Sequence, residues 1–342
     1  MTGLATHVGN RSGAGSRALA RLAVVGAIVL AALAFTADRA DAAFSAQVSN
    51  GTLIITGNGA SDQLALRLQA GVPTMLQVDV GDDGSADFSF DRATFDAITV
   101  DAGSGDDTVR IDEVNGVFTD TETTTIDGQG DDDTLLGGSG AELLLGGAQD
   151  DLVDGNRGND IGILGTGADT FVWDPGDGSD TVEGEGGTDV LVFNGSGANE
   201  NFDFSANGPR LRFFRDVGNI TMDTDGVERV DLEALGGADS TVVNDLAGTD
   251  VDLANIDLEG VLGGGLGDGQ PDTITVNGSN ARDDVRVRAD GSIVDVTGLV
   301  PRVRIARSEA ANDRLTINGL GGNDRFFVGA GLGALIQLTV NQ

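Results

Sequence analysis

The sequence predicts an all-β protein built as a right-handed parallel β-solenoid, and three observations support this fold class. Five acidic residues recur at a strict interval of nine near the middle of the chain. Pairs of apolar residues spaced two apart flank Gly, Asn and Asp turns on both sides of that array, as in strand, turn, strand units. Glycine supplies 54 of 342 residues without a triplet period, and cysteine is absent. Short repeats of this kind along most of a chain are typical of solenoids.

The first 42 residues differ in composition from the rest. Three arginines precede an apolar run that begins at Leu22, and small residues around Ala42 follow it. This order is typical of a secretory signal peptide, and we expect residues 1–42 to be one, cleaved after Ala42. An uncleaved anchor is the alternative, but the run is shorter than the about 20 residues of a membrane span. We therefore expect a secreted, extracellular protein without membrane insertion.

Residues 43–127 are expected to form the N-terminal coils of the solenoid. Their unit is an apolar pair spaced by two, an acid nine residues after the first apolar residue, and a second apolar pair. Alternate residues of a strand share one face, so each unit buries one side of two strands. Two copies are Leu53, Ile55, Asp62, Leu64 and Leu66, and Ile98, Val100, Asp107, Val109 and Ile111. The glycine-rich turn at Asp107 is the one of the two better suited to bind a metal.

Residues 128–195 carry the strict nine-residue array. Its acids are Asp133, Glu142, Asp151, Asp160 and Asp169, with a weaker continuation at Asp180 and Asp189. Each acid closes a glycine-rich turn, and the glycines of interest are Gly128, Gly130, Gly137, Gly146, Gly155, Gly158 and Gly167. An apolar residue follows four of the first five acids by two positions, and Gly162 is the exception.

The period of nine predicts stacked carboxylates. Two nonapeptides make one coil, so acids eighteen residues apart lie on the same edge of the solenoid. Neighbouring coils lie about 4.8 Å apart, and like charges at that distance repel by about 1 kcal/mol even in water. A calcium ion between two carboxylates replaces this repulsion by attraction to the ion, which takes about six to eight oxygen ligands from carboxylates and backbone carbonyls. The array is therefore interpreted as a ladder of calcium sites.

This array resembles the G-G-x-G-x-D-x-U-x repeat of the RTX, or haemolysin-type, calcium-binding family. The copies read GQGDDDTLL, GGSGAELLL, GGAQDDLVD, GNRGNDIGI and LGTGADTFV, and none carries all four motif residues. Glu142 stands for an aspartate, and Gln149 stands for the third glycine. The resemblance implies Ca²⁺ as the cofactor and a β-roll that calcium orders outside the cell.

Residues 196–342 are expected to form the C-terminal coils, with the same unit and longer spacers. The copies are Val230, Leu232, Asp239, Thr241 and Val243; Ile274, Val276, Asp283, Val285 and Val287; and Leu315, Ile317, Asp324, Phe326 and Val328. The turn at Asp324 is expected to bind metal, whereas the turn at Asp283 has fewer glycines.

Charge and missing residue types exclude several functions. The formal net charge is −35, which disfavours nucleic acid and anionic membranes as partners. Cysteine is absent, and the single histidine, His7, belongs to the expected signal peptide. The mature chain therefore cannot form a Ser-His-Asp or Cys-His triad or a histidine zinc site.

We expect a non-enzymatic calcium-binding protein with a structural or surface-binding role. The alternative is a calcium-dependent polysaccharide lyase, because parallel β-helix lyases, which this architecture resembles, can use calcium with an arginine base. Six arginines alternate with apolar residues and would face outward, where they either contact an acidic extracellular glycan or pair with nearby carboxylates. They are Arg210, Arg212, Arg286, Arg288, Arg302 and Arg304.

Overall fold

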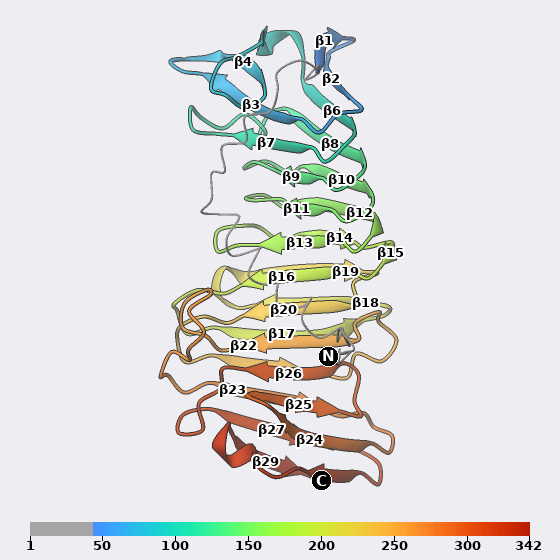
Figure 1. Cartoon of the computed structure of the whole chain (residues 1–342), viewed down its shortest axis with the longest axis vertical. Helices are drawn as coiled ribbons and strands as arrows, with labels where there is room; N and C mark the ends of the chain where they lie inside the picture. Colours follow the sequence, from blue (N-terminus) through green and yellow to red (C-terminus); the bar gives the residue numbers. More distant parts are fainter. Residues whose placement is uncertain (1–43) are drawn as a thin grey trace, which may run out of the picture. The chain divides into compact units, whose positions relative to one another are not determined.

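The computed structural model describes residues 44–342, and this part of the chain is all-β. The expected signal peptide, residues 1–42, lies outside the described residues. Two long sheets run through the described part, and their strands stack coil upon coil (Figure 1). Within residues 44–342, no helix is long and apolar enough to cross a membrane.

The first sheet contains fifteen strands, most of them parallel to their neighbours. In spatial order they are β1 (Ser45–Ser49), β2 (Thr52–Asn58), β6 (Ala97–Ser104), β8 (Thr123–Gly130), β10 (Leu143–Ala148), β12 (Ile161–Gly167), β14 (Thr181–Glu183), β19 (Ile220–Asp225), β18 (Arg210–Arg215), β17 (Asn201–Asn207), β21 (Ser240–Val243), β23 (Thr273–Asn277), β27 (Arg314–Asn318) and β29 (Gln337–Asn341), with β15 (Gly186–Gly187) beside β12.

The second sheet contains fourteen strands. In spatial order they are β28 (Arg325–Val328), β24 (Asp284–Asp290), β25 (Ile293–Thr297), β26 (Arg302–Ala306), β22 (Leu253–Asp257), β20 (Arg229–Glu233), β16 (Val190–Asn194), β13 (Thr170–Trp173), β11 (Leu152–Asp154), β9 (Thr134–Leu136), β7 (Thr108–Asp112), β3 (Gln63–Gln69), β4 (Val72–Val80) and β5 (Phe88–Asp91). Three short 3-10 helices join strands: η1 (Arg92–Thr94), η2 (Val217–Asn219) and η3 (Leu332–Ala334).

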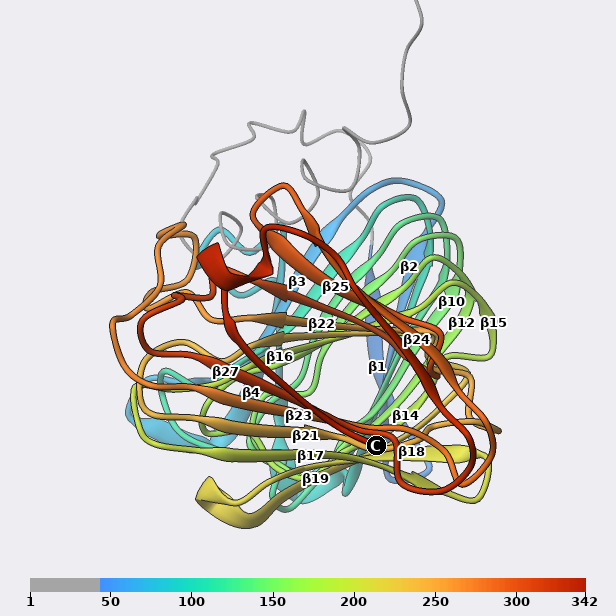
Figure 2. The same ribbon diagram turned by 90° about the horizontal axis from the view of Figure 1, so that it is seen from below.

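The register confirms that two nonapeptides make one coil, which here means one strand of each sheet with its two turns. Leu143 of β10 pairs with Ile161 of β12, and Leu152 of β11 pairs with Thr170 of β13, in both cases eighteen residues away. The sheets enclose one interior when seen from below (Figure 2). Both sheets continue without a break across residues 127/128 and 195/196, where the sequence suggested changes of segment.

The interior is a stack of apolar residues in register. In the second sheet, paired positions run Leu64, Val109, Leu135, Val153, Phe171, Leu191 and Val230, and all seven are fully buried. Gly162, the residue that breaks the apolar pattern, faces this stack. A Cβ on Gly162 would lie 2.8 Å from the Phe171 ring. The missing side chain therefore makes room for the larger aromatic residue in the same coil.

Antiparallel strands join the parallel stack in four places, and the sequence repeat did not predict them. β1 and β2 form a hairpin at one end of the first sheet. β3, β4 and β5 form one meander, β17, β18 and β19 a second, and β24, β25 and β26 a third. Aromatic residues of both sheets pack together beside the second meander. Trp173 stacks on Phe193 with ring centroids 4.0 Å apart, and Phe213 packs 4.5 Å from Phe193. Trp173 is fully buried and is therefore a core residue.

Candidate metal centre

The acids of the nonapeptide array lie at the corners where strands begin. Asp133, Asp151 and Asp169 immediately precede β9, β11 and β13 of the second sheet, and Glu142 and Asp160 immediately precede β10 and β12 of the first. All five are at most 3% exposed. The structure thus gathers the acids at two edges, eighteen residues apart along each edge, as the period of nine predicted.

Hydrogen bonds link the acids of each edge into a line. On the first edge the amide of Asp133 donates to Asp151 Oδ1 at 2.8 Å, and the amide of Asp151 donates to Asp169 Oδ1 at 2.8 Å. The same contact recurs at every step of the whole line, which runs Asp62, Asp107, Asp133, Asp151, Asp169, Asp189 and Glu228. On the second edge it joins Glu142, Asp160 and Asp180 at 2.7 and 2.8 Å.

One oxygen of most of these carboxylates is buried and accepts no hydrogen bond. The open atoms are Oδ2 of Asp107, Asp133, Asp151, Asp160, Asp169 and Asp189, and Oε1 of Glu142. Carboxylate oxygens are ligands that calcium prefers. Within the described residues no three acidic side chains converge on one point, so an ion here would take its remaining ligands from backbone carbonyls or water. The donor set fits a hard divalent cation held between neighbouring coils.

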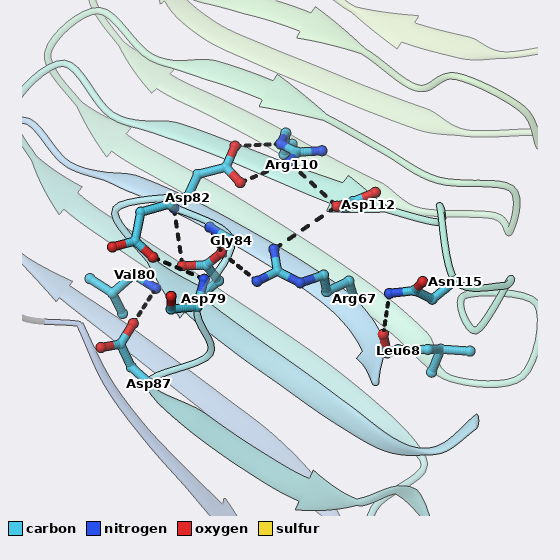
Figure 3. Close-up of polar contacts among 12 residues, drawn as sticks. Arg67, Leu68, Asp79, Val80, Asp82, Gly84, Asp87, Arg110, Asp112 and Asn115 are labelled. Carbon is cyan, nitrogen blue, oxygen red and sulfur yellow. Dashed lines mark hydrogen bonds and ion pairs between the residues drawn. The ribbon is translucent and has the colours of Figure 1, made fainter. Parts of the chain in front are cut away.

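Several other acids of this protein, by contrast, are paired with arginines. Arg67 contacts the fully buried Asp79 at 2.5 Å, and Arg110 contacts Asp82 at 2.6 Å (Figure 3). Arg302 contacts the buried Asp295 at 2.6 Å in the same way. In the described part of the chain, no arginine forms an ion pair with any acid of the two nonapeptide edges. These acids lack a counter-charge from the protein itself.

The pKa values of the line acids are raised by their burial. Burial first, and then the like charges of neighbouring coils, raise the pKa of Asp133 to about 8, of Asp151 to about 7 and of Asp160 to about 9. The amide that each carboxylate accepts lowers the pKa only in part. Near neutral pH these groups are poised between taking up a proton and taking up a cation.

A pH dependence of stability follows for the calcium-free protein. The folded pKa values lie above the unfolded value of about 3.9, so the acids bind more protons in the folded state. The stability that the folded protein gains from protonation of these acids is fully present below about pH 4. It is lost as the pH rises through about 7 to 9. In a chelating buffer, the free energy of unfolding from urea titrations is therefore expected to fall steadily from pH 5 to pH 9. A constant or rising value over that range would show that the lines do not titrate in this way.

The glycines of the array are required by close approach between coils. A Cβ on Gly158 would lie 1.7 Å from the carbonyl oxygen of Gly140, and one on Gly167 would lie 2.0 Å from that of Gln149. Gly137 and Gly146 also face a carbonyl of the next coil within 2.5 Å, whereas Gly128 and Gly155 lie within 2.5 Å of their own carboxylates, Asp133 and Asp160. Gly130 differs, because nothing lies within 4 Å of its Cβ position.

The remaining predicted metal residues divide into two groups. Asp107, Asp180 and Asp189 are buried members of the lines. Asp324 lies apart from them in the last coils. There its Oδ1 accepts the amide of Asp283 at 2.9 Å, and both residues are only half-buried. The sequence placed Asp133, Asp151 and Asp169 on one edge and Glu142 and Asp160 on the other, as observed, whereas Asp324 belongs to a separate, shorter pair.

The sequence repeat missed two features of the carboxylate arrangement. Glu228 ends the first line through its Oε2, which accepts the amide of Asp189 at 2.7 Å. A further line, called here the C-terminal acid line, joins Glu200, Asp239, Asp272 and Asp313 at the starts of β17, β21, β23 and β27. Their spacings of 39, 33 and 41 residues follow no period. The one feature of the sequence that could have indicated this line is the polar turn that precedes each acid.

The six alternating arginines do not form a single row. Arg210 and Arg212 lie on β18 of the first sheet, whereas the other four lie on β24 and β26 of the second. Arg210 contacts Asp223 at 2.6 Å, and Arg302 contacts Asp295 at 2.6 Å. Arg212, Arg288 and Arg304 also have an acidic partner, and Arg286 lies over the Phe327 ring. Of the two alternatives for these arginines, the contacts favour pairing with nearby carboxylates rather than a basic face that would contact an acidic glycan.

No protein-family model matches this sequence, and no curated protein matches it. Among solved structures, the extracellular lipase LipA from Serratia marcescens is similar at 11% identity with a TM-score of 0.19. The match covers 64% of this chain and 43% of the lipase, so the chain spans less than half of that lipase's length. A likeness this slight carries no functional inference.

Proposed function

We propose that this chain is a secreted calcium-binding structural protein, a right-handed parallel β-solenoid in which ions between stacked turns complete the fold. One observation carries the proposal: buried carboxylates stand in line, most of them offer an open oxygen, and none has an arginine partner among the described residues. The RTX-like pattern of the array supports the choice of calcium over other hard cations.

Asp133, Asp151, Asp169 and Asp189 would hold ions along one edge, and Glu142, Asp160 and Asp180 along the other. The ion supplies positive charge and oxygen coordination. The chain supplies carboxylates already oriented by the amide of the preceding coil. Because each carboxylate touches two coils, binding at one level orders its neighbours, and we expect partial cooperativity.

Calcium binding can match the stability of a whole domain. Extracellular calcium modules bind at about 0.1 to 1 mM. At ten times the dissociation constant, each site contributes about 1.4 kcal/mol, and five sites contribute about 7 kcal/mol, within the range of a typical domain. Low calcium inside the cell would leave the chain loose, and high calcium outside would order it.

Equilibrium dialysis of residues 43–342 against calcium tests this function. We expect several ions per chain, with half-saturation near or below 1 mM and little uptake of magnesium, which prefers smaller octahedral sites. Replacing Asp133, Asp151 and Asp169 together by Asn should lower the number of bound ions. The function is wrong if the parent chain takes up no calcium, or if magnesium fills the same sites equally well.

A further inference from the structure

The C-terminal acid line reproduces the geometry of the nonapeptide edges without their sequence. The amide of Glu200 donates to Asp239 Oδ1 at 2.9 Å, that of Asp239 to Asp272 Oδ1 at 2.9 Å, and that of Asp272 to Asp313 Oδ1 at 3.1 Å. All four acids are at most 2% exposed. Each follows a polar turn and immediately precedes a strand of the first sheet.

The two ends of this line are satisfied within the protein. Glu200 forms a buried ion pair with Arg215, and its second oxygen accepts the amide of Ser196 at 2.7 Å. At the other end, both carboxylate oxygens of Asp313 accept amides, one from Asp272 and one from Glu309. Neither end needs a further charge or ligand.

The middle of the line is not satisfied. Asp239 is 2% exposed, and its Oδ2 is buried without a hydrogen-bond partner. Asp272 is equally buried and lies in the next coil, and the partly buried Asp268 lies close enough that its charge acts on both. In residues 44–342, no arginine forms an ion pair with Asp239, Asp268 or Asp272. Arg215 therefore compensates the charge at one end of this line, whereas no arginine of the described residues compensates the two acids in the middle.

We propose that a divalent cation of the calcium class binds between the coils of Asp239 and Asp272, as a site separate from the nonapeptide array. The open Asp239 oxygen and the Asp272 carboxylate provide the charge. Because no three acidic side chains converge in the described part of the chain, backbone carbonyls or water complete the coordination. Asp268, whose Oδ2 accepts the amide of Gly237 at 2.8 Å, holds the adjoining turn beside the site.

The consequence is that calcium also orders the C-terminal coils. Burial of two neighbouring carboxylates without a counter-ion is unfavourable, and an ion between them removes both the repulsion and the open acceptor. The site does not depend on the proposed function of the array, because no nonapeptide residue takes part in it. The two can therefore fail separately.

The test counts bound calcium by equilibrium dialysis in chains that differ at Asp239. Asp239→Asn keeps the acceptor for the Glu200 amide but removes the charge. In the otherwise unaltered chain it is expected to reduce the calcium count by one ion. The exposed Asp252→Asn is the matched control and should leave the count unchanged.

A second background separates this site from the array. In a chain that carries Asp133→Asn, Asp151→Asn, Asp160→Asn and Asp169→Asn, adding Asp239→Asn is expected to remove one further calcium ion. If that background fails to fold, the single Asp239→Asn substitution decides. A count unchanged by Asp239→Asn overturns the C-terminal site and leaves the array intact. No calcium on the parent chain overturns both.

Discussion

Gly158→Ala is expected to destabilise the fold by about 3–5 kcal/mol. The new Cβ would lie 1.7 Å from the carbonyl oxygen of Gly140, and the φ of +140° at this residue disfavours any side chain. The coils cannot move apart to relieve the clash, because the neighbouring amide of Glu142 is bonded to Asp160 Oδ1 at 2.7 Å. Denaturant unfolding in calcium measures the loss.

Gly130→Ala is the matched control for this substitution. It makes the same chemical change in the same array, but nothing lies within 4 Å of the Cβ position and its φ is not in the left-handed region. Its effect should stay within about 0.5 kcal/mol, as for ordinary surface changes. Equal losses for the two variants would mean that coil stacking does not set the need for glycine.

Asp151→Asn is expected to change stability in opposite directions with and without calcium. Asn retains an oxygen acceptor for the amide of Asp133 but removes one buried charge from between Asp133 and Asp169. In a chelator at pH 8 the variant should be more stable than the parent by about 1–2 kcal/mol, since two like-charge contacts are relieved. In saturating calcium it should be less stable, by about 1.4 kcal/mol for each ion lost at tenfold the dissociation constant.

Asp295→Asn is the control for the sign change. Asp295 is 3% exposed and contacts Arg302 at 2.6 Å, so its charge is compensated by the protein. Asp295→Asn loses this ion pair, so a modest loss of stability is expected whether or not calcium is present, because the side chain of Arg302 is 44% exposed. If Asp151→Asn behaved like Asp295→Asn, losing stability in both buffers, the line acids would be ordinary structural carboxylates. Urea unfolding of both variants in both buffers makes the comparison.

The regular part of the fold could be predicted because its period fixes the geometry. Acids nine apart with apolar residues two positions later can only alternate between two edges, and the structure places Asp133, Asp151 and Asp169 on one and Glu142 and Asp160 on the other. The exception at Gly162 needed the structure, because its cause is the Phe171 ring of the facing sheet. A contact between residues of the two sheets cannot be predicted from the spacing of apolar residues in the sequence.

The irregular part could not be predicted because insertions hide the coil length. The meander of β17, β18 and β19 separates Glu200 from Asp239, and that of β24, β25 and β26 separates Asp272 from Asp313, so these neighbours in the C-terminal acid line are 39 and 41 residues apart. The same insertions place Arg210 and Arg302 on different sheets, although their local sequences look alike. Local alternation predicts which face a residue takes, but not which coil carries it.

Far-UV circular dichroism of residues 43–342 in a chelator, followed by calcium addition at pH 8, tests the central claim most directly. We predict weak β-structure in chelator and a cooperative gain of β-structure as calcium approaches 1 mM, with no such gain in magnesium. A full β spectrum in chelator that calcium does not alter would contradict the account. The carboxylate lines would then be held by protons and amides alone, and the fold would not depend on calcium.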